Sequence, residues 1–168
     1  MGGDKGRAPG PVGDADIARL SEADHDELFS AFSRIVEDRD GFPQEPPLSR
    51  TDFDDYWLAH STAVVRARVG GELAGAYYLK PNFVGRAAHI ANAGYFVVAG
   101  FRGRRLGREL IVHSLDEARR VGFDALQFNL VFESNPARRL YEELGFQVVG
   151  RIPRAVDGED ALIYWRAL

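Results

Sequence analysis

The segment 102–107, Arg-Gly-Arg-Arg-Leu-Gly, combines residue types that are suited to holding an anion. It follows the apolar run 95–99 and opens a long amphipathic stretch, 106–121, so the sequence predicts a strand that gives way to a helix. Small residues let an anion approach the backbone, and the free N–H groups of a helix start hold it. Four arginines add positive charge: Arg102, Arg104, Arg105 and Arg108. We interpret the turn as a pyrophosphate site, although an arginine-rich, solvated helix start explains it equally well when taken alone.

Two other classes of phosphate site do not fit this turn. A nucleotide-triphosphate loop needs two glycines that flank four residues and are followed by Lys and then Ser or Thr. A dinucleotide site needs Gly-x-Gly-x-x-Gly and an acidic residue about 20 positions later. The sequence has neither pattern.

The second half of the chain adds a rarer combination of features. Residues 124–132 are rich in β-branched and aromatic types and predict a strand, and residues 133–146 predict a short helix. Asn135 is expected to be the N-cap of this helix, Pro136 its first residue, and Gly145 the left-handed residue that ends it.

On these residues the chain resembles the GNAT-type N-acetyltransferases, which use acetyl-CoA. The resemblance rests on Arg102 and Gly107 of the turn, on Ser134-Asn135, and on residues 140–146 (Leu-Tyr-Glu-Glu-Leu-Gly-Phe). It extends from about residue 64 to the C-terminus. The family normally has a glycine where this chain has Arg105, which is a departure from the pattern.

A narrower resemblance links the chain to the fungal azetidine-2-carboxylate (proline-analogue) N-acetyltransferases. It rests on four segments that match in order and spacing, namely 78–82, 89–94, 102–107 and 127–135. That subgroup also lacks the first glycine of the turn.

The apolar patterns predict seven strands and four helices along the chain. The expected strands are 16–20, 62–69, 72–80, 88–99, 124–132, 146–152 and 160–167, and the expected helices are 24–38, 51–59, 106–121 and 133–146. The resemblance implies a GNAT-like α/β fold: a mixed, mostly antiparallel seven-stranded sheet with about four helices on its two faces and a splayed central pair of parallel strands. We expect residues 1–13 to be a disordered tail and residues 14–168 to form a single acetyltransferase domain.

Acetyl transfer to an amine needs a donor for the developing oxyanion and a proton for the departing thiolate. Tyr141 resembles the family tyrosine near the CoA sulfur and is the expected acid; packing of its ring on the core is the alternative. Asn135 is expected to cap its helix, and the resemblance implies that it also bonds the pantetheine arm.

Asn92 and Asn129 are expected in the interior of neighbouring strands, where asparagine is disfavoured. Buried amides need partners, so two of them suggest a polar pocket. In the resembled subgroup, asparagines at these positions line the substrate site. The alternative is that they satisfy backbone groups at a bulge.

The sequence does not single out a general base. His89 lies early in the fourth expected strand and Glu133 follows the fifth, and both are weaker alternatives to a structural or surface role. A substrate amine of low pKa, or a water chain ordered by the asparagines, would make a dedicated base unnecessary.

The resemblance also implies the residues that bind the cosubstrate. Val97 and Val98 would bond pantetheine through their backbone, with the Val97 N–H on the thioester oxygen. The expected catalytic set is Tyr141, Asn92 and Asn129, and the expected acetyl-CoA-binding set is Val97, Val98, Arg102, Gly103, Arg104, Arg105, Leu106, Gly107, Arg108, Asn135, Arg138 and Tyr141.

Net charge and residue composition argue against several classes of binding partner and cofactor. The net charge of −4 does not favour nucleic acid or an anionic membrane as a partner. The absence of cysteine excludes disulfides and thiolate zinc sites, and we expect no metal. No apolar run is long enough to cross a membrane and no secretory segment is evident, so a cytoplasmic location is expected. Relatives in the family are often homodimers.

The sequence therefore predicts an acetyl-CoA-dependent N-acetyltransferase. The expected acceptor is the amine of a small molecule, an amino acid or an analogue, with direct transfer in a ternary complex. Two alternatives stay open: a protein or peptide N-acetyltransferase, and a non-catalytic acyl-CoA-binding module.

Overall fold

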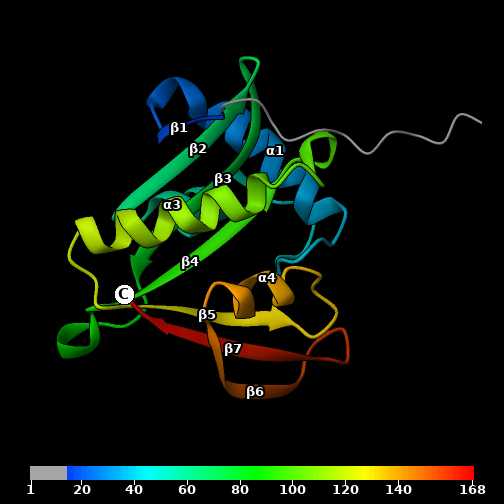
Figure 1. Ribbon diagram of the computed structural model, residues 1–168. Coiled ribbons are helices and arrows are strands. Elements are labelled where there is room, and N and C mark those ends of the chain that lie inside the picture. Colours follow the sequence, from blue (N-terminus) through cyan, green and yellow to red (C-terminus); the bar gives the residue numbers. More distant parts are fainter. Residues whose placement is uncertain (1–14) are drawn as a thin grey trace, which may run out of the picture.

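Seven strands form one sheet with helices on both of its faces in the computed structural model, which describes residues 15–168 (Figure 1). The tail expected over residues 1–13 lies outside the described residues. The strand order is β1-β2-β3-β4-β5-β7-β6. All neighbours are antiparallel except β4 and β5, which are parallel. This is the mixed α/β fold that the resemblance implies.

The order of elements along the chain is the predicted one. The strands are β1 (Asp16–Arg19), β2 (Ala63–Val69), β3 (Glu72–Pro81), β4 (Ile90–Val97), β5 (Ala125–Phe132), β6 (Gln147–Val156) and β7 (Glu159–Ala167). The main helices are α1 (His25–Glu37), α2 (Arg50–Phe53), α3 (Leu106–Arg120) and α4 (Arg138–Glu143). A π-helical turn, Asp54–Leu58, continues α2 directly. Within residues 15–168, no helix combines the length and apolarity needed to cross a membrane.

The parallel strands β4 and β5 pair over only three residues each. Ile90, Ala91 and Asn92 of β4 lie opposite residues 125–127 of β5. Beyond Asn92 the two strands no longer pair, while β4 continues beside β3 and β5 continues beside β7. This register agrees with a splayed central pair, and it leaves a gap between two strands in the middle of the sheet.

Each face of the sheet carries its own apolar core. Helix α1 buries Leu28, Phe32, Ile35 and Val36, which recur at helical spacing, together with the aromatic residues of α2 and its π-helical continuation. Helices α3 and α4 pack on the opposite face, which is the near face in Figure 1. Strand β3 is buried along both faces because it lies between these two layers.

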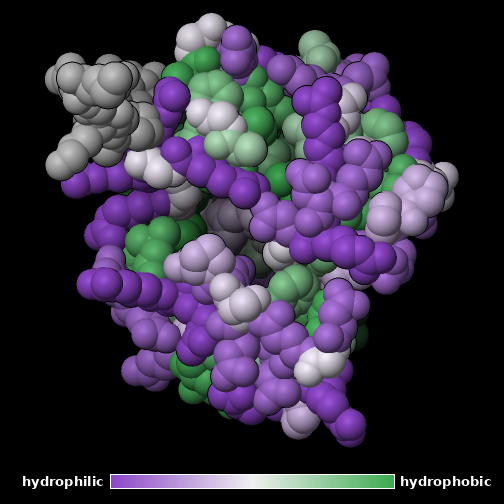
Figure 2. Space-filling model, turned by 90° about the vertical axis from the view of Figure 1, so that its right-hand side faces the viewer, coloured by the Kyte–Doolittle hydropathy of each residue, from purple (hydrophilic) through white to green (hydrophobic). Residues whose placement is uncertain are grey.

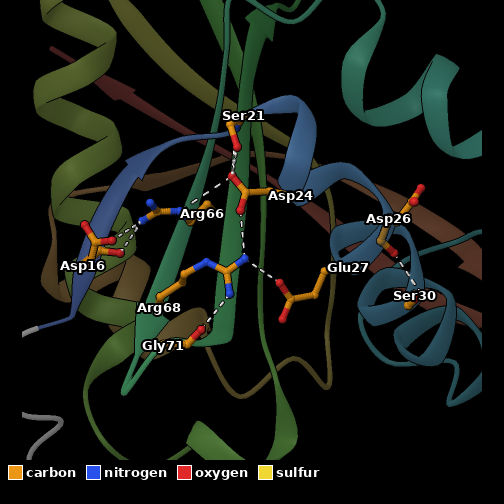
Figure 3. Close-up of polar contacts among 9 residues, drawn as sticks. All are labelled: Asp16, Ser21, Asp24, Asp26, Glu27, Ser30, Arg66, Arg68 and Gly71. Carbon is orange, nitrogen blue, oxygen red and sulfur yellow. Dashed lines mark hydrogen bonds and ion pairs between the residues drawn. The ribbon is translucent and has the colours of Figure 1, made fainter.

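A buried carboxylate fastens the start of α1 to the sheet (Figure 3). Asp24 accepts hydrogen bonds from the N–H and hydroxyl of Ser21 (2.9 and 2.7 Å) and from the guanidinium of Arg68 on β2 (2.8 Å). The bonds from Arg68 and Ser21 favour the ionised carboxylate and hold the pKa of Asp24 well below its usual value. The charge therefore stabilises the junction of β1, α1 and β2.

The start of α4 differs from the prediction. The helix begins at Arg138 with Ala137 as its N-cap, two residues later than expected from Asn135 and Pro136. The Asn135 carbonyl accepts the N–H of Arg138 (3.2 Å), so residues 135–138 form a tight turn before the helix. The Asn135 side chain still accepts a backbone N–H, that of Ala137 (2.8 Å). At the other end Gly145 has a φ of +84°, as predicted for the residue after the helix.

Candidate active site

Free backbone donors surround a cavity at the start of α3. The first bond into the helix runs from the N–H of Glu109 to the carbonyl of Arg105 (3.2 Å). Within residues 15–168, the N–H groups of residues 103–108 have no hydrogen-bond acceptor. The adjoining cavity of about 630 Å³ is lined by Val97, Phe101, Arg102, Gly103, Arg105, Leu106, Gly107, Arg108, Leu140 and Glu143. Such a group of donors at a helix N-terminus suits an anion.

The backbone of this turn takes its shape from two left-handed residues. Gly103 has a φ of +74° and Arg105 a φ of +68°. Glycine adopts this region freely, whereas a residue with a Cβ does so at a cost. This conformation explains why glycine is usual at the position of Arg105. The arginine adopts the left-handed backbone conformation that glycine would adopt there.

The four arginines of the turn are not equivalent. Arg102 donates from Nε to the Val97 carbonyl (3.1 Å), and its guanidinium pairs with Asp40. Arg104 lies 5.7 Å from the ring centroid of Phe101 and does not line the cavity. Two other arginines line the cavity and do not pair with a residue of another loop. They are Arg105 and Arg108, and Arg108 is 3.8 Å from Glu143.

The backbone groups at the end of β4 differ in whether they have partners within the chain. The N–H of Val98 donates to the Ala74 carbonyl (2.8 Å), and the Val98 carbonyl accepts from Phe101 (2.8 Å). Both groups of Val98 are therefore already bonded, and the contact with pantetheine expected for its backbone stays a prediction. Hydrogen-bonded pairs alternate along an antiparallel ladder, so the Val97 N–H points away from β3 and toward the gap.

A second cavity, of about 830 Å³, occupies the gap between β4 and β5. It shares Val97, Arg102, Gly107 and Leu140 with the cavity at the start of α3, so the two cavities lie side by side. Figure 2 shows the face toward which β5 runs in Figure 1, and this face is hollowed near its centre. A volume of this size suits a small organic ligand.

Tyr141 brings a phenol from α4 to the wall of this second cavity. Its ring packs against Phe128 with 4.8 Å between centroids, and its hydroxyl has no hydrogen-bond partner among residues 15–168. Burial raises the pKa of Tyr141 to about 12, so the phenol keeps its proton at neutral pH. Core packing and proton donation are compatible here, since the ring serves the first and the hydroxyl the second.

Asn92 and Asn129 both line the second cavity. Asn92 is buried, and its Nδ2 donates to the Gln127 carbonyl of β5 (3.0 Å) at the last paired position of the two strands. Asn129 accepts from Gln127 Nε2 (2.9 Å) and donates to Asn82. Asn129 does lie within an irregularity of the β5–β7 register, but its side chain bonds other side chains rather than the backbone.

An aromatic wall lies near Asn92 in the second cavity. The Tyr78 hydroxyl lies 3.1 Å from that of Tyr56 and 3.3 Å from Asn92 Oδ1. Gly94 makes room for this ring, since a Cβ there would lie 2.7 Å from Tyr78 Cε1. Lys80 completes the wall, with its Nζ 3.0 Å from the Tyr56 carbonyl. Tyr78 and Lys80 belong to the segment 78–82, one of the four that carry the narrower resemblance.

No unengaged carboxylate lines either cavity within the described residues. Asp40 pairs with Arg102, Asp157 lies 3.9 Å from Arg39, and Glu159 accepts from the Ser134 N–H. Glu143 is paired with Arg139 (3.1 Å).

The two alternative bases lie outside both cavities. His89 is exposed and its ring is bonded to the Arg86 carbonyl (2.9 Å), and Glu133 pairs with Arg151 (3.0 Å). The structure therefore brings neither of them to Tyr141.

Of the remaining expected site residues, one lines a cavity and one does not. Asn135 lines the second cavity. Arg138 does not reach either cavity, because it donates to the Tyr164 hydroxyl (3.1 Å) and to the Glu133 carbonyl (2.8 Å). Residues 15–168 contain no cluster of three or more His, Asp or Glu side chains that would hold a metal ion.

Comparisons with known proteins agree with this geometry. The profile of the Acetyltransferase (GNAT) family matches residues 27–146. The N-acetyltransferase aca1 of Schizosaccharomyces pombe is 44% identical over 84 residues, which are 49% of this chain and 40% of that protein. The chain thus spans less than half the length of this curated relative.

Two solved structures share the fold over most of the chain. A GCN5-related N-acetyltransferase from Kribbella flavida is 30% identical, with a TM-score of 0.84 over 92% of this chain and 98% of its own. The yncA protein of Salmonella typhimurium, solved with its cofactor acetyl-CoA, is 19% identical, with a TM-score of 0.80 over 92% and 94% of the two chains.

Proposed function

Because the chain belongs to the acetyltransferase (GNAT) family, we propose that it transfers an acetyl group from acetyl-CoA to the amine of a small molecule, an amino acid or an analogue, within a ternary complex. One observation carries the proposal. The cavity with free N–H donors at the start of α3 adjoins the cavity lined by Tyr141, Asn92 and Asn129, and the two share four lining residues. This arrangement supports a phosphate site beside a polar pocket at the gap in the sheet.

The residues at the start of α3 fit the pyrophosphate of acetyl-CoA. The free N–H groups of residues 103–108 would donate hydrogen bonds to its oxygens, with Arg105 and Arg108 supplying charge. Asn135 and the Val97 N–H would hold the pantetheine arm in the gap. When bound, acetyl-CoA supplies an acyl group that is activated as a thioester.

Tyr141 is proposed as the group that gives a proton to the departing thiolate. Its hydroxyl is free in the cavity and its raised pKa keeps it protonated, which supports a role as donor. The Val97 N–H is proposed to stabilise the oxyanion, since it points into the gap and remains fixed by the β3–β4 ladder.

Asn92 and Asn129 are proposed to orient the acceptor amine. Their amides stand on the two strands that border the gap and are held by Gln127 and Asn82. Since the carboxylates on the described walls are engaged, the amine is expected to lose its proton to water ordered by these amides.

Several finer assignments belong to the same proposal. We assign the chain to the azetidine-2-carboxylate subgroup on the four segments that resemble it, and we propose that residues 14–168 form one acetyltransferase domain. A cytoplasmic homodimer is proposed from the resemblance to the family alone. Transfer to a protein amine and acyl-CoA binding without turnover are the alternatives that the test separates.

Thiol release from acetyl-CoA tests the proposal against a panel of acceptors: proline analogues, common amino acids, polyamines, aminoglycosides and short peptides. Because the chain has no cysteine, a thiol reagent reports CoA alone. We expect release with small or cyclic amino acids. Release with peptides only would replace the proposal by protein acetylation, and binding of acetyl-CoA without release from any acceptor would replace it by a non-catalytic module.

A further inference from the structure

Lys80 is a half-buried cation on the wall of the second cavity, at the end of β3. Its Nζ donates to the Tyr56 carbonyl (3.0 Å) and lies 4.6 and 4.5 Å from the ring centroids of Tyr56 and Tyr78. The two rings and the carbonyl hold the ammonium in place and leave part of its hydrogen-bonding capacity free, since an ammonium has three donors.

Within the described residues, Lys80 has no carboxylate within 4.0 Å. The other two cations on the wall of this cavity are paired, Arg102 with Asp40 and Arg39 with Glu45. Burial without a counter-ion disfavours the charged form and lowers the pKa of Lys80. A bound anion would compensate for this loss of solvation.

The choice of lysine at this position is unusual for the chain. Of its 21 basic residues, only Lys5 and Lys80 are lysines, and the others are arginines. Lysine presents a compact charge that fits between two rings, whereas the planar guanidinium of arginine is broader. The residue type therefore suits a small enclosed site better than a solvated surface.

The register of the sheet places Lys80 beside Asn92, which is proposed to orient the acceptor amine. Lys80 on β3 lies directly opposite Asn92 on β4. Directly opposite residues project on the same face, with Cβ atoms about 5 Å apart. In an α-amino acid the carboxylate and the amine are attached to the same carbon, so one small ligand can reach both side chains.

We propose that Lys80 binds the carboxylate of the acceptor and so restricts the enzyme to amines that carry a carboxylate on the adjacent carbon. This proposal rests on the proposed function and deepens it, because it names the class of acceptor and the residue that selects it. Tyr56 and Tyr78 act as positioning residues that fix the ammonium toward the cavity.

Two acceptors that differ only in the carboxylate test whether Lys80 selects for this group. Azetidine-2-carboxylate and its carboxamide share the ring and the amine and differ in charge. We expect the wild-type KM for the acid to be at least tenfold lower than for the amide. Lys80→Met should raise the KM for the acid roughly 10- to 100-fold, as for loss of a charge-assisted hydrogen bond, and leave the amide unchanged. Lys80→Arg should keep part of the preference.

Two further measurements separate Lys80 from the proposed function. Arg39→Met removes another cation from the same wall, one already paired with Glu45 (3.1 Å), and should leave the preference for the acid unchanged. Calorimetric titration of the acid into CoA-loaded protein reports binding without turnover, and Lys80→Met should weaken it to the same degree as it raises the KM.

The outcomes are distinguishable. Absence of thiol release with every acceptor contradicts the proposed function, and the calorimetric comparison still decides the role of Lys80. Equal wild-type affinity for the acid and the amide, an unchanged affinity in Lys80→Met, or no binding of the acid to the wild type would each overturn the proposal for Lys80.

Discussion

At the scale of single residues, the proposed chemistry depends most on the hydroxyl of Tyr141. The ring is fixed by contacts with Phe128 and Tyr164, while the hydroxyl faces the cavity without a partner among the described residues. A phenol that lines a cavity without a protein partner can donate its proton to a bound ligand. Removing the oxygen alone therefore separates packing from catalysis.

Tyr141→Phe is expected to lower kcat about 100-fold, the usual scale of a lost general acid. Since the ring remains, the affinity for acetyl-CoA and the thermal midpoint should stay close to those of the wild type. Tyr164→Phe is the matched control, because its hydroxyl is bonded to Arg138 and Glu142 outside the cavities. An unchanged kcat in Tyr141→Phe would remove this residue as the acid.

Only some of the residues that line the second cavity could be recognised from the sequence. Asn92 and Asn129 stood out because amides are unusual in strands, and both line the gap. Tyr78 and Lys80 did not stand out, since a strand buried on both faces gives no alternation from which the cavity side is recognised. The partners of Arg102 and Arg138 lie far along the chain or in a turn, and no spacing rule predicts such contacts.

At the scale of elements, periodicity predicted the main helices and the central strands because these have one buried stripe or lie between two layers, whereas β6 is largely exposed. The start of α4 was placed two residues too early, since a helix cap and a tight turn use the same Asn-Pro pair. The splay of β4 and β5 followed from the resemblance and is visible in the register, but no local pattern encodes where two parallel strands part.

The turn before α3 permits a test of backbone geometry that is independent of charge. Arg105→Gly and Arg105→Val both remove the guanidinium, but glycine adopts the φ of +68° freely whereas valine adopts it at a cost. A β-branched residue there costs about 1–3 kcal/mol or moves the turn. We expect Arg105→Val to weaken acetyl-CoA binding at least tenfold more than Arg105→Gly in calorimetry. Equal affinities in the two variants would show that the path of this turn does not determine binding.

At the scale of the whole molecule, the sheet joins two layers that each supply one part of the site. The α3–α4 side brings the turn 102–107 and Tyr141, and the α1–α2 side brings the aromatic wall around Lys80. The contact of Arg102 with Asp40 connects this turn to the loop that follows α1. The site therefore depends on how α1 is held to the sheet, which is the role of Asp24.

Asp24→Asn is expected to destabilise the protein by about 1–3 kcal/mol at pH 7, as for loss of hydrogen bonds to a charged group. The pKa of Asp24 is lowered in the folded protein, so its contribution is complete above the unfolded value of 3.8 and is lost as the pH falls below it. The thermal midpoints of wild type and variant should thus converge in acid.

Asp26→Asn is the control for this comparison, because it breaks an exposed pair with Arg50 and should change stability by less than about 1 kcal/mol. A difference between wild type and Asp24→Asn that is the same at pH 3 and pH 7 would contradict the assignment of the effect to the charge.

A crystal structure with CoA and a cyclic amino acid tests the central claim most directly. We predict that the pyrophosphate accepts hydrogen bonds from the N–H groups of residues 103–108 and that the sulfur lies beside the Tyr141 hydroxyl. The amine should lie between Asn92 and Asn129, with the carboxylate on Lys80. A pyrophosphate away from the start of α3, or an amino acid outside the gap between β4 and β5, would contradict the account.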